Sequence, residues 1–192
     1  MEEFKDFLNR HMEVSPEDWE VINSKLQFKS AHKDEIITEH KRVEDNIYFL
    51  QSGAVRLFYE GENKDVTLNI GFPKDFIGSH SSLLTREKSE FLLQCLTPCE
   101  MAYISHNDLM DIYANTICGH QLGRIFTEKI FLYLSKRENS FLLKSPTERY
   151  LDLFKEQPQL VLEIPQKYLA SYIGITPQAL SRIRAKLVKQ RS

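Results

Sequence analysis

The spacing of hydrophobic positions changes along the chain. Between residues 28 and 105, short apolar runs separated by turns give six candidate strands: Glu35–Thr38, Asn46–Gln51, Ala54–Tyr59, Asp65–Ile70, Phe91–Leu96 and Glu100–Ile104. Runs at intervals of about ten residues are typical of an antiparallel β-sandwich or barrel, not of a parallel βαβ sheet. After Ser105 the spacing becomes helical, over 106–113 and then over 116–141. The pattern therefore predicts a β domain followed by a long helix.

Two further helix starts carry capping chemistry. Ser15 precedes Pro16 and two acidic residues, and Ser145 stands three residues before Glu148 in capping-box spacing. The second helix is expected to run to about residue 155, with a domain boundary near 142–145. The apolar run Leu160–Ile164 is interpreted as a short strand that leads into the carboxy-terminal segment.

The long helix has apolar residues on more than one side. One broad stripe consists of Cys118, Leu122, Ile125, Phe126, Ile130, Tyr133 and Leu134, and Phe131 and Leu132 lie outside it. A helix that is apolar on two sides must pack against another element on each side, and the β domain can pack against only one of them. We therefore predict a symmetric dimer whose interface includes Leu122, Ile125, Phe126, Ile130 and Tyr133. The alternative is that the carboxy-terminal domain folds back over the helix.

The segment 165–187 has the pattern of helix, turn, helix. Leu169, Ala170 and Ile173 form the inner face of the first helix, and Gly174 supplies the left-handed conformation that ends it. Thr176 can cap the second helix, with Pro177 at its first position. The second helix has an apolar face of Leu180, Ile183 and Leu187, and an opposite face of Gln178, Ser181, Arg182, Ala185 and Lys189.

The distribution of charged residues along the chain also distinguishes this segment from the rest. The chain has 192 residues with 25 Lys+Arg against 27 Asp+Glu, so its overall balance is close to neutral. From Pro165 onward there is no acidic residue, and there are six basic ones: Lys167, Arg182, Arg184, Lys186, Lys189 and Arg191. The preceding part is left with 19 basic and 27 acidic residues. An acidic body with a basic tail indicates an anionic partner, although a basic helix can also be a solvated surface.

These side chains suit the major groove of double-stranded DNA. Gln can bond adenine and Arg can bond guanine, and a recognition helix reads bases with residues near its amino end. Basic residues farther along would contact phosphates. The predicted DNA-binding residues are Lys167, Thr176, Pro177, Gln178, Ser181, Arg182, Arg184, Lys186 and Lys189, with Arg191 as a further phosphate contact.

The sequence gives little support for a secreted protein, a membrane protein, a metalloprotein or an enzyme. The first residues lack the apolar run of a secretion signal, and no stretch is long enough to span a membrane, so we expect a cytosolic protein. Cys95, Cys99 and Cys118 lie among apolar residues and are expected to be reduced and buried. The six histidines contain no H-x-H pair, and no nucleophile elbow or phosphate loop is present. We therefore expect no enzyme activity, metal or cofactor.

At this point the chain resembles the Crp/Fnr family of bacterial transcription regulators. The likeness rests on the hairpin-like Asn46–Leu57, on Asp75-Phe76-Ile77-Gly78, and on Leu169–Leu187. It implies an α+β protein: an antiparallel double-stranded β-roll or jelly roll over 1–115, a dimerisation helix and hinge over 116–143, and a winged-helix-like helix-turn-helix over 144–192, with a shortened wing. It also implies double-stranded DNA, a second copy and RNA polymerase as partners, and an on–off shift of the long helix and hinge.

The sequence departs from the nucleotide-binding members of that family. There, a Glu follows the glycine that matches Gly78 and a later Arg pairs with the cyclic phosphate, whereas this chain has Ser79 and then Ser89-Glu90. Arg86 could compensate only if the loop register shifts. Loss of an Arg–phosphate pair predicts that cAMP is not the ligand.

A pocket is nevertheless expected between the roll and the long helix. Its predicted lining is Ile77, Gly78, Ser79, Ser89, Phe91, Leu134 and Ser135, which favours a small neutral or weakly polar effector, or none. Haem sensing would require an axial ligand such as His80 or His106, and a lone histidine is more often a surface or capping residue. The functional alternative to a DNA-binding regulator is a dimeric sensor or protein-interaction module with a vestigial helix-turn-helix.

Overall fold

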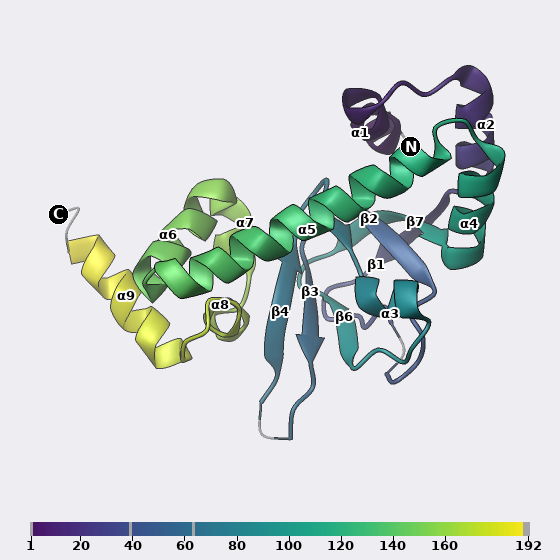
Figure 1. Ribbon diagram of the computed structural model, residues 1–192. Coiled ribbons are helices and arrows are strands. Elements are labelled where there is room, and N and C mark those ends of the chain that lie inside the picture. Colours follow the sequence, from purple (N-terminus) through teal and green to yellow (C-terminus); the bar gives the residue numbers. More distant parts are fainter. Residues whose placement is uncertain (1, 39, 63, 190–192) are drawn as a thin grey trace.

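The computed structural model describes residues 2–38, 40–62 and 64–189. Its helices are α1 (Glu2–His11), α2 (Pro16–Lys25), α3 (His80–Thr85), α4 (His106–Asn115), α5 (Gly119–Leu143), α6 (Pro146–Glu156), α7 (Pro158–Glu163), α8 (Gln166–Tyr172) and α9 (Pro177–Lys189). Its strands are β1 (Gln27–Ala31), β2 (Asn46–Ser52), β3 (Val55–Tyr59), β4 (Val66–Gly71), β5 (Phe76–Ile77), β6 (Phe91–Cys95) and β7 (Cys99–Ser105). Helix α5 runs along the molecule from the amino-terminal helices to the four carboxy-terminal ones (Figure 1).

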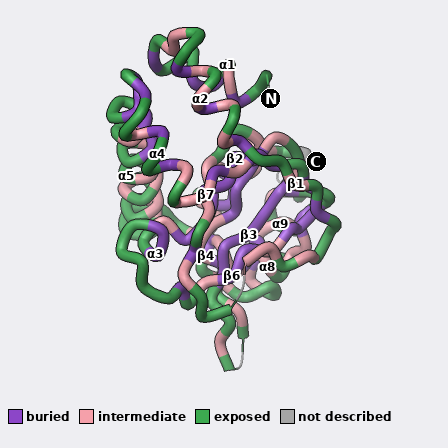
Figure 2. Tube along the Cα trace, turned by 90° about the vertical axis from the view of Figure 1, so that its right-hand side faces the viewer, coloured by how far each residue is buried: buried purple, intermediate pink, exposed green. Residues whose placement is uncertain are grey.

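Two antiparallel sheets form the β domain. One has the strand order β1-β7-β2-β5 and the other β4-β3-β6. In the first sheet Phe49 pairs with Ala102, and in the second Leu57 pairs with Leu93. The buried segments gather on these strands (Figure 2). The predicted α+β class, with an antiparallel β-roll before a long helix, is confirmed.

Three amino-terminal details differ from the sequence prediction. The expected strand Glu35–Thr38 makes an isolated bridge between Ile36 and Gln94 and no continuous ladder. The sheet edge is formed instead by β1, whose residues are mostly exposed, so the strand lacks the apolar alternation that would have revealed it. Helix α1 was also missed, although Phe4, Phe7 and Leu8 have helical spacing and are buried.

Helices α1 and α4 share one buried core with the amino-terminal half of α5. Phe126 of α5 lies in an aromatic cluster with Phe76, at 4.4 Å between ring centroids, and Phe76 in turn contacts Phe7 of α1 at 5.0 Å. Leu122 and Ile125 belong to the same buried core. These three α5 side chains are therefore covered within the chain. This corrects their assignment to a dimer interface, because a second copy cannot reach them in this arrangement.

A buried carboxylate fixes the start of α5. Asp18 of α2 accepts hydrogen bonds from the backbone N–H groups of Ile117 and Cys118, both at 3.0 Å. Free amides at a helix start carry the positive end of its dipole, so an anionic acceptor stabilises them. The sequence pattern placed Asp18 correctly in a first turn but did not reveal this second role.

The carboxy-terminal unit consists of four helices. Ser145 and Glu148 make the predicted capping box at the start of α6. The expected strand over residues 160–164 is wrong, because Pro158 begins helix α7 there. Val161 and Ile164 are buried three residues apart while Leu162 is exposed, which is helical spacing. In the part described, this unit contains no strand, so no wing precedes α8.

This unit docks on the β4-β3-β6 sheet. Ala54, Ile70 and Leu96 of the β domain share one hydrophobic core with residues of α6, α8 and α9. The Thr67 N–H donates to Ser171 Oγ of α8 at 2.9 Å. Arg56 of β3 is 2% exposed, and its guanidinium lies between the rings of Phe58 and Tyr168, at 3.7 and 3.8 Å. The carboxy-terminal helices are therefore packed on the sheet and not merely tethered to it.

Candidate functional site

The turn between α8 and α9 is a Schellman motif. The Ile175 N–H donates to the Ala170 carbonyl at 2.9 Å, and the Gly174 N–H donates to the Ser171 carbonyl at 3.1 Å. Gly174 has φ +76°, and a Cβ at this position would lie 2.7 Å from Cε1 of Phe141. Glycine is thus required here both by the backbone conformation and by the close approach of α5.

Helix α9 starts and packs as the sequence predicted. Thr176 Oγ1 accepts the Ala179 N–H at 3.2 Å, which is the expected cap. Leu180 is buried, and Ile183 and Leu187 pack against the same core. The apolar face of α9 therefore points into its own unit, and the opposite face is left for solvent or a partner.

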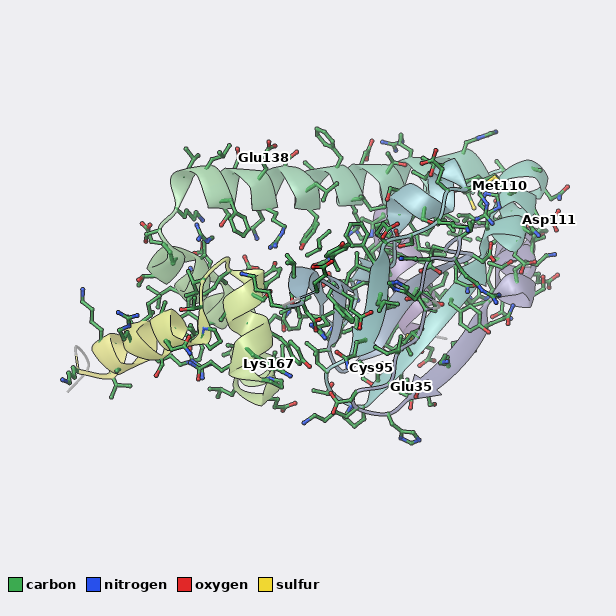
Figure 3. All side chains as sticks on the ribbon, turned by 90° about the horizontal axis from the view of Figure 1, so that it is seen from below. Glu35, Cys95, Met110, Asp111, Glu138 and Lys167 are labelled. Carbon is green, nitrogen blue, oxygen red and sulfur yellow. The ribbon has the colours of Figure 1, made fainter. Side chains whose placement is uncertain are left out.

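The outer face of α9 presents polar and basic groups. Every member of this set is exposed: Thr176, Pro177, Gln178, Ser181, Arg182, Ala185, Lys186 and Lys189. Lys167 is exposed on α8 (Figure 3). Arg184 differs from the prediction because it turns inward, where its Nε donates to the Tyr150 hydroxyl at 3.1 Å. Arg191 lies outside the described residues.

A second exposed surface runs along the carboxy-terminal half of α5. Phe131, Leu132 and Leu134 are 66%, 64% and 56% exposed, and Leu142 and Leu143 are exposed as well. Phe131, Leu134, Glu138 and Leu142 recur at spacings of three and four and so share one side of the helix. Glu138 projects away from the rest of the chain (Figure 3). We call the exposed apolar residues Phe131, Leu132, Leu134, Leu142 and Leu143 the α5 surface.

A cavity of about 380 Å³ lies between the β-roll and α5. It is lined by Leu57, Leu68, Asn69, Lys74, Asp75, Phe76, Gly78, Ser79, His80, Ser81, Phe91, Lys129, Ile130, Tyr133, Leu134 and Arg137. Of the predicted lining, Gly78, Ser79, Phe91 and Leu134 are present. Ile77 belongs to the hydrophobic core, and Ser89 and Ser135 are not among the lining residues. Ile130 and Tyr133, which were predicted at a dimer interface, also line this cavity.

The β-roll cavity has apolar side chains and serine hydroxyls, and it also has charged groups that the predicted lining lacked. Lys74, Lys129 and Arg137 bring three cations to the lining, and Asp75 brings a carboxyl group. Lys74 and Asp75 come from the β4–β5 loop, and Lys129 and Arg137 come from α5. Ser79 is 3% exposed and its Oγ has no hydrogen-bond partner among the described atoms. Burial lowers the pKa of His80 to about 4, which leaves its imidazole neutral near pH 7.

We call residues 75–90 the cassette, because the family resemblance implies that the matching segment binds the cyclic phosphate in nucleotide-binding members. The residues in and near the cassette are engaged with other parts of this protein. Arg86 pairs with Asp45 and donates to the Glu44 carbonyl at 3.1 Å, so the guanidinium is held outside the cavity lining. Ser89 Oγ is held by the backbone of Phe91, accepting its N–H at 3.0 Å. Glu44 is buried, which raises the pKa of its carboxyl, and it accepts the Asn46 N–H at 3.2 Å. The described residues therefore offer no arginine of the cassette to a cyclic phosphate.

The described part of the chain contains no group of three or more His, Cys, Asp or Glu side chains that could hold a metal ion. Among its helices, none is both long and apolar enough to cross a membrane. Cys95, Cys99 and Cys118 are buried free thiols, as predicted.

The described chain thus consists of a two-layer β-roll, a long helix and a unit that contains a helix-turn-helix. Residues 28–116 match the family model of the cyclic nucleotide-binding domain. Comparison with curated protein sequences gave no significant match.

Solved structures extend the match to the whole chain. FixK2 from Bradyrhizobium japonicum superposes with a TM-score of 0.74 at 16% identity, covering 86% of this chain and 85% of that one. The c-di-GMP responsive global regulator CLP of Xanthomonas campestris gives 0.70 at 14% identity, covering 92% and 93%. A Eubacterium rectale protein described as a transcriptional regulator of the Crp/Fnr family gives 0.71 at 15%, covering 96% and 88%. The chain thus has the fold of Crp/Fnr transcription regulators, as its motifs implied, and residues 28–116 are similar to the cyclic nucleotide-binding domain.

Proposed function

We propose that this protein is a cytosolic, homodimeric transcription regulator that binds an inverted repeat in double-stranded DNA and acts by binding, not by catalysis. The observation that carries the proposal is the outer face of α9. A Schellman turn and a threonine cap fix this helix, its apolar side is buried, and its opposite side presents amides, hydroxyls and cations to solvent. That combination suits insertion into a major groove.

Different residues of this face have different roles. Gln178, Ser181 and Arg182 lie in the first turns of α9 and would read base edges, because the amino end of a recognition helix enters the groove. Lys186 and Lys189 follow along the helix, and Lys167 lies on α8, where they would neutralise phosphates. The inward-facing Arg184 is assigned a structural role within the unit.

The α5 surface is assigned to a second copy of this chain. Its apolar residues lie on the part of α5 that neither α1 nor the β-roll covers, and two parallel copies of one helix face make a symmetric contact. Such a dimer would present two α9 helices to successive major grooves about one helical turn apart. A Phe131→Asp variant should sediment as a monomer at concentrations where the parent chain is a dimer, whereas Arg124→Ala, on the same helix, should not.

The β-roll cavity is assigned to an effector other than cAMP. The support is the position of Arg86, which is held by Asp45 and Glu44, together with Ser79 where the family's nucleotide-binding members have Glu. Calorimetric titration with cAMP should show no saturable heat, and tight saturable binding would contradict the assignment.

DNA binding is tested by selecting bound duplexes from a random pool and measuring their affinity across salt concentrations. Arg182→Ala should weaken the selected site by about 1–3 kcal/mol and relax preference at the base pair it contacts. Lys189→Ala should weaken all sequences alike and reduce the salt slope by roughly one. Failure to enrich any sequence would instead favour a sensor with a vestigial helix-turn-helix. An unchanged site preference for Arg182→Ala would remove its base-reading role.

A further inference from the structure

A second cleft lies outside the β-roll cavity, at the junction of the two parts of the chain. It has a volume of about 270 Å³ and lies between the β4–β5 region, α5, α6 and the end of α8. Ile70, Phe72 and Leu153 contribute apolar walls. It shares Asp75, Tyr133 and Arg137 with the β-roll cavity, while Arg149, Phe141 and Tyr172 line this junction cleft alone.

Two arginines share one aromatic ring in the junction cleft. The Cζ atoms of Arg137 and Arg149 lie 4.8 and 4.6 Å from the ring centroid of Phe141. Arg137 donates to the Tyr172 carbonyl at 3.2 Å, and Arg149 donates through Nε to the Ile173 carbonyl at 3.0 Å. Both guanidinium groups therefore hold the last carbonyls of α8, and neither forms an ion pair with a carboxylate among the described residues.

The remaining charges of the junction cleft are largely neutralised. Lys136 pairs with Glu156 and Lys144 pairs with Asp152, each at 2.6 Å. Asp75 accepts the Phe72 N–H at 2.9 Å, and burial raises the pKa of its carboxyl. The lining has four cationic and three acidic side chains, so a net positive charge remains in the cleft. Burial and the neighbouring Arg137 both lower the pKa of Arg149, as expected for cations lacking a counter-ion.

We propose that the junction cleft binds a small organic carboxylate with an apolar body, whose carboxylate bridges Arg137 and Arg149. A guanidinium fork matches a carboxylate in geometry as well as charge, and each arginine retains N–H donors beyond those given to α8. The apolar body of the ligand packs on Ile70, Phe72 and Leu153. Most small-ligand sites have this composition: an apolar lining with a few convergent polar groups.

Occupancy of this site would influence the helix-turn-helix. Arg137 belongs to α5, Arg149 belongs to α6, and both hold the end of α8 immediately before the Gly174 turn. A ligand bridging the two arginines connects the long helix to the DNA-binding unit. It therefore favours the arrangement in which α8 is packed against α5, by an amount equal to its difference in affinity for the docked and undocked arrangements.

The experiment is a fluorine NMR titration of the full chain with 4-fluorobenzoate, and with 4-fluorobenzamide as a neutral probe of the same shape. The carboxylate should bind at least about tenfold more tightly than the amide, because the amide cannot form the charge-assisted pairs. Equal affinity of the two probes would overturn the proposal.

Variants locate the binding site. Arg149→Gln should weaken 4-fluorobenzoate binding about tenfold, and Arg149→Lys, which keeps the charge, should restore part of it. Asp152→Asn leaves Lys144 without its partner, so it should strengthen binding about threefold. This last variant is at the exposed rim, so it remains informative if Arg149→Gln does not fold.

Two controls separate this cleft from other anion sites. Arg124→Gln removes an exposed arginine from the same helix, where it pairs with Glu128, and should leave binding unchanged. Lys129→Gln alters the β-roll cavity without touching the junction cleft and should also have no effect. A loss of affinity in Lys129→Gln with none in Arg149→Gln would place the carboxylate in the β-roll cavity and overturn the proposal. DNA binding by α9 does not enter any of these measurements.

Discussion

Replacing Gly174 by alanine should loosen the helix-turn-helix by two separable effects. The backbone at this position has φ +76°, which costs an L-residue about 1–2 kcal/mol. The new Cβ would also lie 2.7 Å from Cε1 of Phe141, and an overlap with a packed side chain typically costs about 1–3 kcal/mol. The midpoint of the combined range is about 3.5 kcal/mol, which corresponds to a fall in Tm of roughly 7–14 °C for a chain of this size.

The two effects can be distinguished by a double-mutant cycle with Phe141→Leu. The smaller side chain removes the ring atom that the new methyl group would meet but leaves the backbone conformation unchanged. Gly174→Ala should therefore cost about 1–3 kcal/mol less in the Phe141→Leu background than in the parent chain. Chemical denaturation followed by circular dichroism measures both differences.

The reasoning is refuted if Gly174→Ala costs less than about 0.5 kcal/mol, a change ordinary at unconstrained surface positions. It is refuted in part if Gly174→Ala costs the same in the parent chain and in the Phe141→Leu background, because the contact between the new Cβ and the Phe141 ring would then not contribute to the loss of stability. The DNA affinity of the variant, measured on a selected site, should fall along with its stability, since the cap geometry of α9 depends on the same turn.

Three further changes test separate parts of the structure. Asp18→Ala removes the acceptor of the Ile117 and Cys118 N–H groups and should lower the free energy of unfolding by about 2–4 kcal/mol in urea denaturation; an Asp18→Asn variant should lose less. Arg56→Ala removes the group stacked between Phe58 and Tyr168, and should cost about 2–4 kcal/mol and increase protease cleavage within the carboxy-terminal helices; unchanged cleavage would mean that this contact does not hold α8 on the sheet. Burial raises the pKa of Glu44 in the folded state, so its favourable contribution is complete below the unfolded pKa and is lost as pH rises through the folded pKa. Stability of the parent chain relative to Glu44→Gln should accordingly decline as the pH rises above the ordinary pKa of a glutamate, and a difference that does not change with pH would show that the carboxyl has no shifted pKa.

Local sequence signals identified the elements whose evidence lies within a few residues. The capping box at Ser145, the Gly174 turn and the Thr176 cap were all predicted from short-range chemistry and are present in the structure. Alternating apolar runs gave most of the β-roll. Where the run was short, as at 160–164, apolar residues alone could not distinguish a strand from a helix, and the position of Pro158 decided for the helix.

The site predictions divided in the same way. The exposed face of α9 followed from helical spacing and the absence of acidic residues after Pro165. Arg184 did not, because its inward turn depends on Tyr150, thirty-four residues earlier. Likewise the cations of the β-roll cavity come from Lys74, Lys129 and Arg137, which no local motif connects.

The sequence by itself determined most of the helices and strands, several of the turns, and where positive charge is concentrated, because these depend on neighbours along the chain. Tertiary structure alone decided what covers α5. Phe76 contacts Phe126 and Phe7 contacts Phe76, so the apolar face of the amino-terminal half of α5 is buried within the chain, and exposed apolar residues remain on the carboxy-terminal half around Phe131. It also placed Arg137 beside Arg149 through their common contact with Phe141. The spacing of apolar residues predicts that one face of a helix is buried. Which element packs against that face depends on contacts between residues far apart in the sequence, which the spacing does not reveal.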